Sequence, residues 1–172
     1  MKNSRGVTLI ELMTVVAIVG IFGAIGGLTI VKALPGYQLR KAASAMVADF
    51  RKARSMAIKL NRSVTLSFNA SQGKYWLDGK KLPGSMPDTL TTYYGGGVAF
   101  GFPGRSSSDS VHFSNGGATI TFDTTGLTGG VSGYVYLQNS KGKGYRIGVT
   151  NLAANIKMDQ CESASVNCTV NP

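Results

Sequence analysis

The sequence predicts an α+β fold in which a long N-terminal helix packs against an antiparallel β-sheet. Three observations predict it: residues 7–31 are almost entirely apolar, residues 37–62 have the periodicity of an amphipathic helix, and after Asn61 the hydrophobic period changes to two. The chain has 172 residues. Roughly 140 of them remain for one globular domain once the apolar segment is set aside.

The apolar segment 7–31 contains a single charged residue, Glu11. As a helix it would be about 37 Å long, more than the roughly 30 Å hydrocarbon core of a bilayer. Lys2 and Arg5 precede it, and positive charge before a first apolar segment keeps that end in the cytoplasm. We therefore expect a membrane-spanning helix with the rest of the chain outside. A cleaved secretory signal and a plain membrane anchor are the alternatives.

Residues 37–62 predict an amphipathic helix that covers one face of the sheet. Pro35 and Gly36, just before it, are the only strong helix breaker of this region. Seven basic residues against Asp49 alone give the segment much of the chain's net charge of +10. We interpret the basic faces as solvated, with contact to anionic lipid, another protein or nucleic acid as alternatives. The apolar stripe recurs every three or four residues: Leu39, Ala42, Ala43, Met46, Phe50, Ala53, Ala57 and Leu60.

Short segments with period-two patterning follow the helix and predict strands. The first two are joined by a turn at residues 69–73 and predict a β-hairpin. Glycine-rich stretches at 95–97 and 101–108 predict loops. The predicted strands are 64–68, 74–77, 89–94, 110–113, 118–123, 132–138, 145–150 and 156–158.

Two cysteines, Cys161 and Cys168, predict a disulfide that closes a short loop, provided that the domain is exported. Free thiols are the alternative. A metal site built from two thiols and the single His112 would lack ligands. The sequence also has no nucleophile elbow and no phosphate-binding glycine motif, so we expect a protein that is not an enzyme and carries no cofactor.

Residues 5–12, Arg-Gly-Val-Thr-Leu-Ile-Glu-Leu, resemble the processing site of type IV prepilins and type II secretion pseudopilins. The resemblance implies a type IV pilin-like fold in which prepilin peptidase cuts after Gly6 and methylates Val7, while Glu11 guides assembly with other pilins. It also implies a single pass through a bacterial inner membrane, a periplasmic C-terminal domain and contact with an inner-membrane assembly platform. Two departures are Val7, where Phe is commoner, and Leu28, where many major pilins have Pro.

Residues 39–68 are similar to the GspH/FimT branch of pseudopilins and minor pilins. This similarity implies a low-abundance subunit of a type II secretion pseudopilus or a type IV pilus, organised as leader 1–6, filament-core helix 7–31, amphipathic helix 32–62 and β-rich domain 63–172. The alternative function is a DNA-binding minor pilin that acts in DNA uptake. Its candidate contacts with DNA or another anionic surface are Arg51, Lys52, Lys141, Lys143, Arg146 and Lys157.

Overall fold

The computed structural model describes residues 6–78, 89–102, 110–150 and 153–161, with only the backbone described at 25–30. The chain forms two compact units, Met1–Leu34 and Pro35–Pro172. Helix α1, Leu9–Leu60, begins in the first unit and ends in the second. The strands of the described residues lie in the second unit, so the fold is α+β as predicted.

Helix α1 continues through Pro35, although Pro35 and Gly36 are the strongest helix breaker of this region. Proline has no N–H and usually costs about 3 kcal/mol inside a helix, because a carbonyl one turn earlier loses its donor. Residues 31–34 are exposed, so water can satisfy that carbonyl. Exposure of the helix at this point explains why the proline does not end it.

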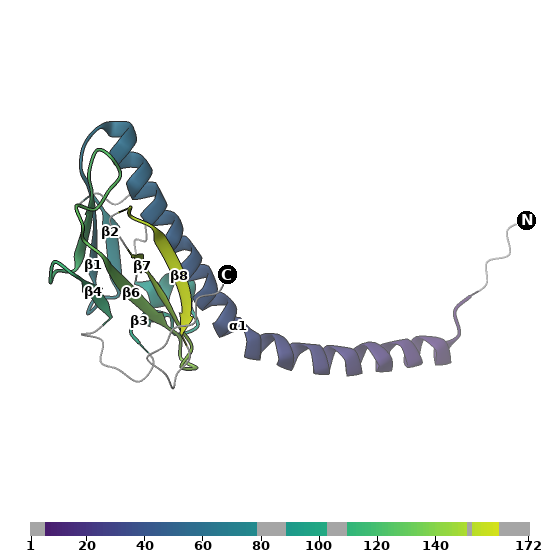
Figure 1. Ribbon diagram of the computed structural model, residues 1–172. Coiled ribbons are helices and arrows are strands. Elements are labelled where there is room, and N and C mark those ends of the chain that lie inside the picture. The colour runs from purple at the N-terminus through teal and green to yellow at the C-terminus, as the bar shows by residue number, and fades with distance from the viewer. Residues whose placement is uncertain (1–5, 79–88, 103–109, 151–152, 162–172) are drawn as a thin grey trace, which may run out of the picture. The chain divides into compact units, whose positions relative to one another are not determined.

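The β-strands of the second unit form two antiparallel sheets (Figure 1). One has the order β2-β1-β5 and consists of β1 Val64–Asn69, β2 Lys74–Leu77 and β5 Thr119–Phe122. The other has the order β3-β6-β7-β8, with β4 also pairing with β6. Its strands are β3 Ala99–Phe100, β4 Val111–Phe113, β6 Gly133–Gln138, β7 Gly144–Val149 and β8 Ile156–Cys161.

The apolar stripe of α1 forms the centre of the core, as the sequence predicts. Seven of its eight predicted members are at most 1% exposed, and they cluster with the inward side chains of both sheets. Phe50 stacks on Phe68 of β1, with ring centroids 5.9 Å apart. Leu60 is the exception, since it is 52% exposed. It is the last residue of α1, and Asn61 at φ +47° then turns the chain away from the helix.

One predicted strand is wrong, because residues 89–94 form a helical turn. Helix α2, Leu90–Tyr94, begins after Thr89, whose hydroxyl accepts a hydrogen bond from the Thr92 N–H at 3.2 Å. It ends at Gly95, whose positive φ of 71° suits a helix C-terminus. These capping residues outweigh the β propensity of the threonines and tyrosines between them. Strand β3 was not predicted.

Candidate functional site

The N-terminal motif lies at the start of α1. Thr8 precedes the first helical residue, its carbonyl accepts from the Leu12 N–H at 3.2 Å, and its hydroxyl accepts from the Glu11 N–H at 3.3 Å. The spacing of Thr8 and Glu11 is that of a capping box, and the capping role of Thr8 was missed by the sequence reasoning. Gly6, Val7 and Glu11 are all exposed. Among the described residues, Glu11 forms no ion pair.

The first unit exposes apolar side chains around the whole circumference of its helix. Within the described residues, no helix reaches the combination of length and hydropathy that crossing a membrane requires, so the span predicted at 7–31 is not confirmed. The exposed apolar residues, each more than half accessible, are Val7, Leu9, Ile10, Leu12, Met13, Val15, Val16, Ile18, Val19, Ile21, Phe22 and Val31. None of these side chains belongs to the hydrophobic core cluster of the described residues.

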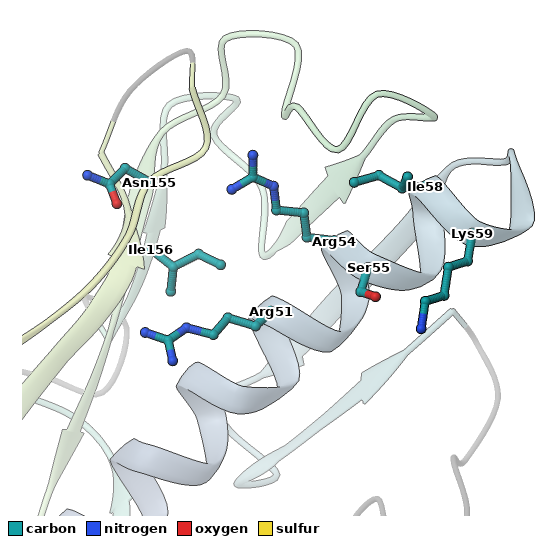
Figure 2. Close-up of a pocket in the computed structure, with 7 residues that line it drawn as sticks. All are labelled: Arg51, Arg54, Ser55, Ile58, Lys59, Asn155 and Ile156. Carbon is teal, nitrogen blue, oxygen red and sulfur yellow. The ribbon is translucent and has the colours of Figure 1, made fainter.

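A second surface, which we call the basic groove, runs between the later turns of α1 and strand β8. Its largest part has a volume of about 490 Å³. In Figure 2 the side chains of Arg51 and Arg54 extend from α1 toward Asn155 and Ile156. An adjoining part of about 360 Å³ shares Arg51 and Ile156. A third part of about 210 Å³ adjoins the second at Ser44 and is lined by described residues of α1 alone. The lining residues are Tyr37, Arg40, Lys41, Ser44, Val47, Arg51, Arg54, Ser55, Ile58, Lys59, Asn155, Ile156 and Met158.

The lining of the basic groove is cationic and apolar. Its described lining residues include arginines, lysines and aliphatic side chains but no Asp or Glu. The Arg54 guanidinium donates to the Ala154 carbonyl at 3.5 Å, which ties α1 to the loop before β8. Near the same end, a Cβ added to Gly126 would lie 2.7 Å from Ile58 Cδ1, so the loop after β5 also packs on α1.

A sequence signal for the basic groove existed, although we did not use it. Positions 40, 44, 47, 51, 54 and 58 recur at helical spacing, next to the buried stripe. Such a second stripe marks the part of a helix that borders its packing face. The contribution of β8 could not be found in this way, because it depends on which strand lies at the edge of the sheet.

The residues predicted to contact DNA do not form one site. Arg51 lines the basic groove, whereas Lys52 is exposed on α1 outside it. Lys141 and Lys143 belong to the turn between β6 and β7, and the Lys143 N–H donates to the Asn139 side chain at 3.0 Å. Lys157 is exposed on β8.

Arg146, the remaining predicted contact, is partly buried and paired with the buried Asp159. The register places Tyr136, Arg146 and Asp159 side by side across β6, β7 and β8. Arg146 donates Nε–H and Nη2–H to Asp159 Oδ2, and its guanidinium carbon lies 4.4 Å from the centre of the Tyr134 ring. Burial lowers the pKa of Arg146, but hydrogen bonding to Asp159 and its charge outweigh this and raise the pKa above its ordinary value.

The tyrosines near this site are also separated. Tyr134 and Tyr136 alternate with buried Val135 and Leu137, so they share the outer face of the sheet. Tyr145 pairs with Leu137 and therefore lies on the core face. The sequence places the three tyrosines close together, but the period of two distributes them over both faces.

Cys161 is the last residue of β8 and is 1% exposed. Its sulfur is not a free thiol. Cys168 lies outside the described residues, so the pairing of the two cysteines stays a prediction. Among the described residues, His, Cys, Asp and Glu side chains do not gather into a group that could hold a metal ion.

Comparison with known proteins gives two family matches. Residues 42–153 match the family described as "Type II transport protein GspH", and residues 1–27 match the "Prokaryotic N-terminal methylation motif". A curated relative, a fimbrial protein of Moraxella nonliquefaciens, is 33% identical over 95 residues. That alignment covers 55% of this chain and 53% of the relative, so the chain matches about half the length of that protein.

Solved structures similar to this chain include the type IV minor pilin FimU of Pseudomonas aeruginosa in two crystal forms. The P65 form gives a TM-score of 0.44 at 16% identity, covering 70% of this chain and 92% of FimU. The P21 form gives 0.45 at 14% identity, covering 75% and 92%.

Proposed function

The chain belongs to the family of the type II transport protein GspH, and from this premise we propose that it is a minor subunit of a type II secretion pseudopilus or a type IV pilus. In this proposal prepilin peptidase removes residues 1–6 and methylates Val7. The helix that follows waits in the membrane and then packs among the helices of other subunits. The N-terminal methylation motif at residues 1–27 supports the processing step.

The observation that carries the proposal is the exposure of the first turns of α1. A helix that is apolar on all sides is stable only when lipid or other helices surround it. Ile10 and Phe22 are 69% and 71% exposed, and the residues between them are exposed on every face of the helix. Another molecule must therefore cover this helix, and a filament core made of the apolar helices of other subunits supplies such a cover.

Glu11 provides the specificity that apolar contacts lack. Apolar helices gain little from one another in a lipid environment, so a polar pair sets their register. Cleavage after Gly6 frees the amine of Val7, which becomes the cation nearest to Glu11 in the motif. Within a filament, the Val7 amine of one subunit can neutralise the Glu11 carboxylate of its neighbour. Removing one member of such a buried pair costs about 3 to 5 kcal/mol.

The test is a Glu11→Gln variant in cells that assemble filaments. Gln at this position keeps the length of the side chain and remains compatible with a capping box, but it cannot carry the charge. We expect normal cleavage of the leader and a loss of the subunit from sheared filaments, measured by quantitative immunoblotting. Normal incorporation of Glu11→Gln would contradict the proposal.

Two further variants separate charge from helix capping and from processing. Thr8→Ala removes the hydroxyl that caps α1 but keeps the carboxylate, so it should assemble nearly normally. Gly6→Val should block cleavage, because a branched side chain does not fit next to the scissile bond in the peptidase. If Thr8→Ala fails as completely as Glu11→Gln, the role of Glu11 is local helix capping rather than intermolecular pairing.

A further inference from the structure

Strand β8 is an edge strand that borders the basic groove. Among the described residues it pairs with β7 alone. The Thr150 N–H donates to the Asn155 carbonyl at 3.1 Å, and in an antiparallel pair such bonds recur at every second residue. Lys157 and Asp159 therefore direct their backbone groups toward β7. Ile156, Met158 and Gln160 direct theirs toward the open edge.

The open edge and the basic groove belong to one surface. The side chains of Ile156 and Met158 line the groove. In Figure 2 the side chains of Arg51 and Arg54 extend from α1 into the space between this helix and Ile156. A strand added beside β8 would continue the sheet under α1. Every second side chain of that strand would then enter the groove, where it would meet aliphatic groups and guanidinium groups.

We propose that β8 accepts an extended acidic segment of a neighbouring subunit as an additional strand, with acidic side chains of that segment bound by Arg51 and Arg54. The identification of the partner as a neighbouring subunit rests on the proposed function, whereas the binding of an acidic strand does not depend on it. The charge of the groove carries the assignment, since the described residues that line it include basic residues at both ends and no Asp or Glu. Arg40 lines one end of the basic groove and Lys59 lines the other.

Nucleic acid is a less suitable occupant of the basic groove. A phosphate backbone only accepts hydrogen bonds, whereas the open edge of β8 presents donors and acceptors in alternation. A peptide backbone satisfies both kinds of group. The aliphatic contacts of Ile58, Ile156 and Met158 also suit side chains better than phosphates.

The test uses the full chain in detergent and a fluorescent peptide of about eight residues that alternates glutamate and valine, long enough to span β8. A peptide with glutamine in place of glutamate is the control for charge. We expect saturable binding of the acidic peptide, measured by fluorescence anisotropy, and binding at least about tenfold weaker for the glutamine peptide. Amide exchange followed by NMR should slow at Ile156, Met158 and Gln160 when the acidic peptide binds.

Variants locate the binding surface. Arg51→Gln combined with Arg54→Gln should weaken binding of the acidic peptide about fivefold to tenfold. Lys52→Gln combined with Lys143→Gln removes the same charge outside the groove and should leave binding within about twofold. Both double variants leave the sequence of β8 unchanged. Slower amide exchange at β8 in the parent chain therefore locates the bound peptide independently of the effect of the variants on affinity.

Three results would overturn the inference. One is no binding of the acidic peptide, and another is binding without slower exchange at the edge of β8. The third is tighter binding of a single-stranded oligonucleotide that displaces the peptide, which would assign the groove to nucleic acid. The proposed function survives any of these results, because assembly through Glu11 is measured separately in filaments.

Discussion

Replacing Arg146 by methionine tests whether this residue is part of the structure or part of a binding surface. Its partner Asp159 is 2% exposed, and the Arg146 side chain is 22% exposed. Asp159 Oδ1 already has no hydrogen-bond partner among the described residues. In Arg146→Met, Oδ2 loses both of its donors as well, and the carboxylate stays buried without a counter-charge. Stranding one member of a buried pair costs about 3 to 5 kcal/mol.

A loss of this size should lower the melting temperature by roughly 10 to 15 °C for a domain of this length. The assay is thermal and urea unfolding of the full chain in detergent, followed by circular dichroism. Lys157→Met is the matched control, because Lys157 is exposed on the neighbouring strand, and its effect should stay within about 0.5 kcal/mol. Arg146→Met combined with Asp159→Leu should recover most of the loss, since it removes both charges. An Arg146→Met variant as stable as the control would refute this reasoning.

Two other substitutions test the packing of α1 on the sheets. The Tyr75 hydroxyl donates to Asp49 Oδ2 at 2.6 Å, so Tyr75→Phe should cost about 1 to 3 kcal/mol in urea unfolding. Burial, then the charge of Asp49 and the hydrogen bond to it, raise the pKa of Tyr75 above its ordinary 10.0. The contribution of Tyr75 to stability is therefore complete below pH 10 and is lost as the pH rises further. The parent chain should lose more stability than Tyr75→Phe between pH 8 and about pH 11. Gly126→Ala should destabilise more than Gly116→Ala, because both glycines have positive φ but only at Gly126 would a Cβ meet Ile58. Equal losses for the two alanine variants would show that the contact with Ile58 contributes nothing.

The helical part of the fold could be predicted because its signal is local. Residues such as Met46 and Phe50 recur at helical spacing, and they are buried in the structure. The fate of Pro35 could not be predicted, since it depends on whether the freed carbonyl is exposed. The turn at residues 90–94 was missed because β propensity was weighed above the capping residues Thr89 and Gly95.

The candidate sites were predictable to different degrees. The motif around Glu11 is contiguous in sequence, so its residues could be named in advance, although the capping role of Thr8 was overlooked. The basic groove combines α1 with β8, and their proximity depends on strand order, which a single sequence does not reveal. Arg146 was predicted to be a surface contact because its partner Asp159 lies on the next strand and meets it only through the β7–β8 register.

The mass of the mature chain in purified filaments tests the central claim most directly. If assembly depends on the amine that cleavage exposes, the subunit recovered from sheared filaments should have lost residues 1–6, leaving 172 − 6 = 166 residues, and should carry an N-methylated Val7. Recovery of filament-bound subunits that still begin at Met1 would contradict the claim, because Val7 would then have no free amine to pair with Glu11.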